Sequence, residues 1–102
     1  MKTLILLEAN IAHTPKDPEE RMKLWMRMLE SVKAGVDSGE TEMWGISLSG
    51  DKGFSISSLS EQEIFANLAS YSPYVKFKIL KMLSVDEAIA AVKELAKRMP
   101  KG

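Results

Sequence analysis

Residues 41–57, TEMWGISLSGDKGFSIS, predict a β-hairpin. Between Thr41 and Ser49 large apolar side chains recur at every second position, which is typical of a strand. The residues from Gly50 to Gly53 are turn formers, and Phe54 and Ile56 then resume the alternation. One face of the first strand carries Trp44, Ile46 and Leu48, and the other carries Met43, Gly45 and Ser47.

A strand and a helix are expected before this hairpin. The run from Thr3 to Ile11 is β-rich, and its apolar segment Leu4–Leu7 needs cover on both faces, which favours a central strand. A helix begins at Asp17-Pro18-Glu19-Glu20, a capping sequence in which Glu20 completes a capping box, and Gly39 ends it. Its apolar stripe is Met22, Trp25, Met26, Leu29, Val32 and Val36.

A helix, a strand and a further helix are expected after the hairpin. Ser60 and Glu63 form a second capping box, before an apolar stripe of Ile64, Phe65, Leu68 and Ala69. Pro73 ends that helix, and Val75, Phe77 and Ile79 then alternate with polar residues as in a strand. A third capping box, Ser84 to Glu87, begins a helix with a narrow apolar seam of Ala88, Ile89, Val92, Leu95 and Ala96.

The order of these elements predicts an α+β fold of the ferredoxin-like βαββαβ type. Right-handed crossovers would place two helices on one face of a four-stranded antiparallel sheet, and the last helix is an addition. A chain of 102 residues suits one core, and no linker or repeat divides it, so residues 1–102 form a single domain.

One face of such a sheet has no helices. One side of the Leu4–Leu7 run, with Met43, Leu80 and Met82, is expected there, which makes this face apolar. A second copy of the chain is the simplest cover, since a two-fold axis lets one patch serve both subunits. The alternative is a monomer with scattered apolar residues on this face, or with the last helix partly covering it.

The element order, the length and the segment Tyr71–Ile79, YSPYVKFKI, resemble the dimeric α+β barrel superfamily, particularly muconolactone-isomerase-like proteins. Gly53-Phe54-Ser55-Ile56 is similar to the strand that precedes the second helix in that family. The resemblance implies a dimeric α+β barrel in which two sheets face each other, with a pocket in each subunit. It does not specify an activity, because one fold carries many functions.

Two ionisable residues are candidates for catalysis. Glu8 and Asn10 share the face of Leu4 and Leu6, so a carboxylate and an amide could point toward one cavity, with Glu8 as a base. His13, the single histidine, follows the first strand and could act as a base or ligate haem. The structural alternatives are a Glu8–lysine pair at the sheet edge and an exposed loop histidine.

Aromatic side chains are candidates for binding a planar substrate. Tyr71 and Tyr74 flank Pro73 and offer hydroxyl groups near the mouth of a pocket. Trp25 and Trp44 are further candidates for substrate binding, although they also lie on stripes assigned to the core, as do Phe65 and Phe77. Asn10 completes the set of predicted binding residues.

Composition argues against several classes of protein. The formal charge is zero, and Lys52–Ile56 lacks the second aromatic of an RNA-binding strand, so no nucleic acid partner is expected. One histidine and no cysteine give no metal site, and no cofactor is expected. No segment approaches the ~18 apolar residues of a membrane span, and the early polar residues Glu8 and Asn10 argue against a secretion signal. A cytoplasmic homodimer with a small-molecule ligand is the resulting expectation.

Two functions are compatible with these residues. The first is an enzyme that acts on a small planar organic compound, of the isomerase or cofactor-free monooxygenase type. The second is a non-catalytic module that binds a small molecule or another protein.

Overall fold

The computed structural model describes residues 2–100. They form an α+β fold with a four-stranded antiparallel sheet and three α-helices, as predicted. The elements are β1 (Lys2–Ala9), a 3-10 turn (Ile11–His13), α1 (Pro18–Ser38), β2 (Thr41–Ile46), β3 (Lys52–Ser57), α2 (Glu61–Ala69), β4 (Val75–Met82) and α3 (Val85–Arg98). This arrangement is broadly compatible with a ferredoxin-like fold.

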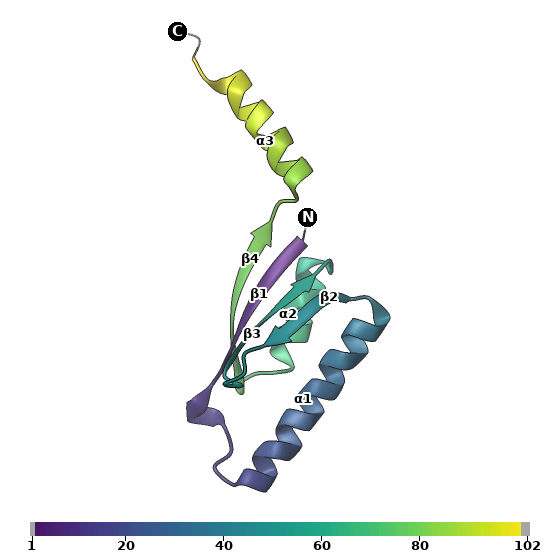
Figure 1. The fold of residues 1–102 in the computed structure, drawn as a ribbon, viewed down its shortest axis with the longest axis vertical. Helices are drawn as coiled ribbons and strands as arrows, with labels where there is room; N and C mark the ends of the chain where they lie inside the picture. Colours follow the sequence, from purple (N-terminus) through teal and green to yellow (C-terminus); the bar gives the residue numbers. More distant parts are fainter. Residues whose placement is uncertain (1, 101–102) are drawn as a thin grey trace.

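The strands lie in the order β2-β3-β1-β4, with every neighbouring pair antiparallel (Figure 1). The first strand is therefore central, as its apolar run predicts. Leu4 lies opposite Ile56 of β3 and Leu80 of β4, and Ile5 lies opposite Ser55 and Ile79. Because successive side chains point to opposite faces, these two rows belong to different faces of the sheet.

The row that contains Ile5 lies under α1 and α2. Ile5, Leu24 of α1 and Ile64 of α2 are the buried apolar residues of the described chain. They all line one cavity, so both helices cover the same face of the sheet. The other face, which contains Leu4, Leu6, Phe54, Ile56, Met43, Leu80 and Met82, is called here the open face.

Capping residues define the helix starts. Asp17 Oδ2 accepts a hydrogen bond from the Glu20 amide at 3.0 Å. Ser60 Oγ accepts from the Glu63 amide at 3.3 Å, but the Glu63 carboxylate accepts from the Ser60 hydroxyl rather than from its backbone amide. A complete reciprocal capping box is present only at α3 among the described helices. The boxes predicted for α1 and α2 are thus each half formed.

Two strands are shorter than the sequence suggests. The predicted strand to Ser49 ends at Ile46, because Ser47 begins a turn in which the Gly50 amide donates to its carbonyl at 2.9 Å. The first strand ends at Ala9 rather than Ile11, since the His13 amide donates to the Asn10 carbonyl in a 3-10 turn. At the end of α1, Gly39 adopts φ +85°, which confirms it as the C-cap.

The predicted inward stripes of α1 and α2 need correction. Leu24 is the buried residue of α1, whereas Met22 and Met26 of the predicted stripe are exposed. On α2, Ile64 is buried but Phe65 is 76% exposed. Apolar residues occupy more than half of the circumference of α1, so helical periodicity alone does not define which side meets the sheet.

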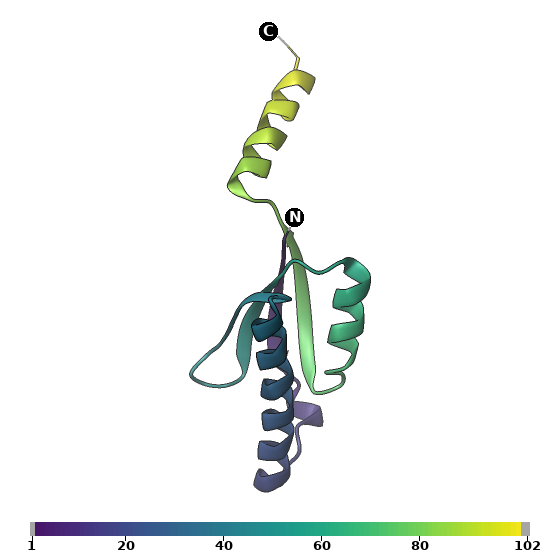
Figure 2. The same ribbon diagram turned by 90° about the vertical axis from the view of Figure 1, so that its right-hand side faces the viewer.

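The last helix extends away from the sheet (Figure 1), and the view turned by 90° shows the same separation (Figure 2). It lengthens the molecule to 66 × 28 × 26 Å. Four apolar residues of α3 form an exposed stripe: Val85, Ile89, Val92 and Leu95. The alternative in which the last helix covers the open face is therefore not the observed arrangement.

Candidate functional site

A cavity of about 610 Å³ lies between the sheet and the two helices α1 and α2. Its volume is in the range of small-molecule sites, roughly 300–1,000 Å³. The sheet provides Ile5, Leu7, Trp44 and Phe77, and the helices provide Leu24, Met28, Val32, Ile64 and Leu68. The wall is mainly apolar.

The floor of the cavity is formed by small residues of β3. Gly53, Ser55 and Ser57 alternate on the helix-covered face, where bulky apolar residues would otherwise fill the space. A Cβ atom at Gly53 would lie 2.5 Å from the Gly45 carbonyl oxygen, so no larger residue fits there. The hollow thus follows from the side chains of one strand.

Four of the predicted substrate-binding residues meet at this cavity. Trp25, Trp44, Tyr71 and Tyr74 all contribute to its wall. The Tyr71 hydroxyl lies 3.1 Å from Ser31 Oγ of α1 and donates a hydrogen bond to it. Their roles in binding a substrate stay predictions, but their placement around one cavity is observed.

Aromatic and cationic contacts orient these rings. The Tyr71 and Phe77 rings meet edge to face, with centroids 6.3 Å apart. The Arg21 guanidinium lies over the Trp25 ring, 5.7 Å from its centroid, near the start of α1. Phe54 and Phe65 do not line the cavity, because Phe54 is on the open face and Phe65 is 76% exposed.

The predicted pair of Glu8 and Asn10 does not converge on the cavity. Glu8 contributes to the rim, but strand alternation assigns its side chain to the open face, opposite Lys52 and Lys76. Asn10 is not part of the cavity wall, and its amide donates to the Pro73 carbonyl at 2.8 Å. Asn10 thereby ties the end of β1 to the segment before β4.

His13 also lies apart from the cavity. It ends the exposed 3-10 turn and is not among the residues that line the cavity. Its location matches the alternative of an exposed loop histidine. The catalytic roles assigned to Glu8 and His13 stay predictions, without a shared site between them.

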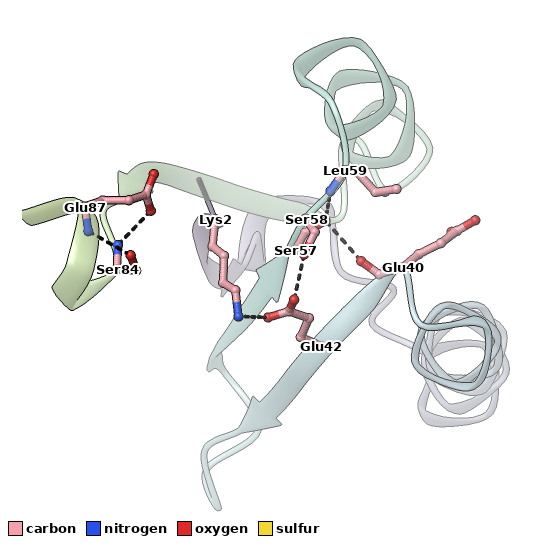
Figure 3. Close-up of polar contacts among 8 residues, drawn as sticks. All are labelled: Lys2, Glu40, Glu42, Ser57, Ser58, Leu59, Ser84 and Glu87. Carbon is pink, nitrogen blue, oxygen red and sulfur yellow. Dashed lines mark hydrogen bonds and ion pairs between the residues drawn. The ribbon is translucent and has the colours of Figure 1, made fainter.

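A polar network lies where β2 and β3 meet the helices, among residues that line the cavity (Figure 3). The Ser57 hydroxyl donates to the Glu40 carbonyl and accepts from the Leu59 amide, each at 3.2 Å. All three of these residues line the cavity. The network fixes the loop between β3 and α2, and therefore the position of that wall.

A second link joins β1 to this network (Figure 3). Lys2 Nζ lies 2.8 Å from the Glu42 carboxylate, and the Ser58 hydroxyl donates to the same carboxylate at 2.6 Å. The hydrogen bond from Lys2, followed by that from Ser58, lowers the pKa of Glu42. Through its side chain, Glu42 of β2 connects β1 to the loop that follows β3.

Ser55 is a site residue that sequence reasoning missed. It is 9% exposed and lines the cavity, between Ile5 of β1 and Trp44 of β2 in the sheet register. Within residues 2–100 its hydroxyl has no hydrogen-bond partner, in contrast to Ser57. The sequence does show that Ser55 and Ser57 alternate with Phe54 and Ile56, which places the serines on one face of the strand. Which of the two faces meets the helices depends on the strand register.

Neither a metal cluster nor a membrane helix is found in the described part of the chain. No group of three or more histidine or acidic side chains in residues 2–100 could hold a metal ion. None of the helices there has the length and apolar character needed to cross a membrane.

The sequence was compared with protein-family models and with curated proteins. No protein-family model matches the sequence. No curated protein matches it either.

Proposed function

We propose that this protein is a small-molecule-binding homodimer that holds a flat, largely apolar ligand between the sheet and helices α1 and α2. The cavity carries this proposal. It combines a volume of about 610 Å³, a wall with two tryptophans and two tyrosines, and a few hydroxyl groups. Binding sites for small molecules commonly combine an apolar wall with a few polar groups.

The homodimer part rests on the open face. Leu6, Leu80 and Met82 are each about 40% exposed there, on the two adjoining strands β1 and β4. Lysines adjoin these apolar residues, since Leu6 lies opposite Lys78 and Met82 opposite Lys2. Exposed apolar residues bordered by polar ones are typical of interaction sites. Sheet-to-sheet pairing about a two-fold axis would bury the same patch on both copies.

The exposed stripe of α3 agrees with this proposal. It follows β4 directly, so the apolar residues of the open face continue into a helix that one copy leaves without cover. In a sheet-to-sheet dimer a projecting helix can reach the other copy. The resemblance to dimeric α+β barrels would then extend to the assembly, and membership of that superfamily is part of the proposal.

Catalysis receives less support than binding. The isomerase or cofactor-free monooxygenase hypothesis assigned proton transfer to Glu8 and His13. The Glu8 side chain lies on the open face, and His13 does not line the cavity. The hydroxyl pair of Tyr71 and Ser31 can fix the orientation of a ligand without any chemical step.

A cavity-filling variant tests the binding proposal. Val32 lines the cavity, whereas Val36, one turn later on α1, does not. We expect some members of a panel of flat aromatic alcohols, acids and lactones to raise the melting temperature of the wild-type protein, because a ligand that binds only the folded state stabilises it. Val32→Phe should abolish this rise, and Val36→Phe should retain it.

The proposal fails if no compound in the panel raises the melting temperature. It also fails if Val32→Phe responds to the ligands as the wild type does. Circular dichroism of both variants checks that the fold is intact.

A further inference from the structure

The ionisable groups at the cavity are concentrated at its rim. Four charged residues contribute to the wall, namely Glu8, Glu40, Asp51 and Lys52, and all four are exposed. Three are carboxylates and one is a lysine, and no arginine or histidine takes part. The lysine is Lys52, which lies opposite Glu8 in the sheet register, and both side chains are on the open face.

This distribution makes the interior unfavourable for an anion. A carboxylate or phosphate in the cavity would lose its hydration without gaining an opposite charge, and buried charges are costly unless they are paired. No cationic side chain offsets this cost, because alternation along β3 assigns the Lys52 side chain, like that of Glu8, to the open face. A neutral molecule loses much less on entry.

Among the cavity hydroxyls that bond to no other described residue, that of Ser55 belongs to the most buried side chain. Ser55 is more than nine-tenths buried, it faces the cavity from the middle of the sheet, and its hydroxyl bonds to no other residue of the described chain. Its two sheet neighbours on this face, Ile5 and Trp44, provide an apolar surface on either side. The hydroxyl opens onto the cavity and is not a sealed group without a partner, so a ligand oxygen can hydrogen-bond to it in place of water.

We infer that the cavity selects an uncharged, flat molecule whose single hydroxyl or carbonyl oxygen hydrogen-bonds to Ser55, with the aromatic part between Trp44 and helix α1. This inference rests on the proposed function, and it names the ligand class. Ser55 both donates and accepts, so alcohols, phenols and ketones all fit.

Three compounds of one size test the inference at pH 7.5. They are 2-naphthalenemethanol, which is neutral, 2-naphthoate, which is anionic, and 2-methylnaphthalene, which has no oxygen. We expect the alcohol to bind the full chain at least ten-fold more tightly than the carboxylate in isothermal titration calorimetry. Tighter or equal binding of 2-naphthoate would overturn the neutral selection and leave the proposed function standing.

The anchor is tested with two buried hydroxyl groups. Ser55→Ala should weaken binding of 2-naphthalenemethanol about five-fold and leave binding of 2-methylnaphthalene unchanged, as expected for one neutral hydrogen bond. Thr3→Val is the matched control, because Thr3 is 8% exposed on the same face but does not line the cavity. Equal loss in both variants, or none in Ser55→Ala, would refute the anchor. If none of the three compounds binds the wild type, the proposed function itself fails with it.

Discussion

Along strand β3 the helix-covered face carries small residues and hydroxyl groups, whereas the open face carries large apolar side chains. Thr3, Ser55 and Ser57 lie beneath the helices, and Phe54 and Ile56 of the same strand β3 lie on the open face. In a sheet with one solvated face the opposite distribution is usual. The difference suggests that each face serves a purpose beyond the stability of a single copy. Hydroxyls suit a ligand cavity, and exposed apolar residues suit a partner.

The comparison explains the position of Gly45 as well. On the open face it lies opposite Phe54, and a Cβ atom there would come within 2.7 Å of the Phe54 ring. The aromatic ring thus occupies the space that a side chain on β2 would need. A larger residue at position 45 would therefore require the Phe54 ring to move.

The largest expected effect concerns the open face. Leu4 lies at its centre between Ile56 and Leu80, so Leu4→Glu should place an unpaired carboxylate in a dimer interface. We expect the dissociation constant of the dimer to rise at least about a hundred-fold, or roughly 3 kcal/mol. Light scattering coupled to size exclusion should show the mass fall from twice 11.4 kDa to 11.4 kDa.

Leu48→Glu is the control for this change. Leu48 is fully exposed in the loop after β2 and lies off the open face, so the variant should keep the mass of the wild type. A wild-type protein that is monomeric at micromolar concentration would contradict the proposed assembly. A dimeric Leu4→Glu variant would move the interface elsewhere, with the stripe of α3 as the remaining apolar surface.

A smaller effect distinguishes the inward and outward sides of α1. Leu24 is 6% exposed against the sheet, and Leu24→Ala should lower the free energy of unfolding by about 3 kcal/mol through lost burial and a larger cavity. Met22→Ala, at a position 64% exposed, should lower it by less than about 0.5 kcal/mol. Urea denaturation measures both. An equal loss of unfolding free energy in both variants would mean that the predicted stripe, which contains Met22, also packs against the sheet.

The fold was more predictable than the site. The strand and helix starts follow from local chemistry: Asp17, Ser60 and Ser84 each cap a helix, and Gly39 ends one. The apolar run of β1 correctly indicated a central strand. These signals depend only on residues that are close together in the chain, so they can be recognised in a single sequence.

The cavity depends on relations between distant residues. Nothing local indicates that Ser55 lies under the helices, because its face is set by pairing with Ile5 and Trp44. The rotation of α1 that buries Leu24 and exposes Met26 depends equally on the sheet beneath it. Glu8 was assigned correctly to the face of Leu4, but the cavity formed on the other side. Register and helix rotation are tertiary properties, and they decide which residues share a site.

The smallest expected effect concerns the link between the open face and the cavity wall. Lys2 and Ser58 lower the pKa of Glu42 below the ordinary glutamate value of 4.5. A carboxyl whose pKa is lower in the folded than in the unfolded state stabilises the fold at pH values above its unfolded pKa. This contribution is lost as the pH falls through the lower, folded pKa.

Glu42→Gln should therefore unfold at a lower urea concentration than the wild type at pH 7, and the difference should shrink in acid, below about pH 4. Glu30→Gln is the matched control, since Glu30 is exposed on α1 and makes no contact of this kind with another described residue. A gap between wild type and Glu42→Gln that is equally large at pH 3 would show that Glu42 acts through packing rather than charge. Because Ser58 lies next to Ser57, loosening this carboxylate should also loosen the cavity wall, so Glu42→Gln should bind 2-naphthalenemethanol slightly more weakly than Glu30→Gln does.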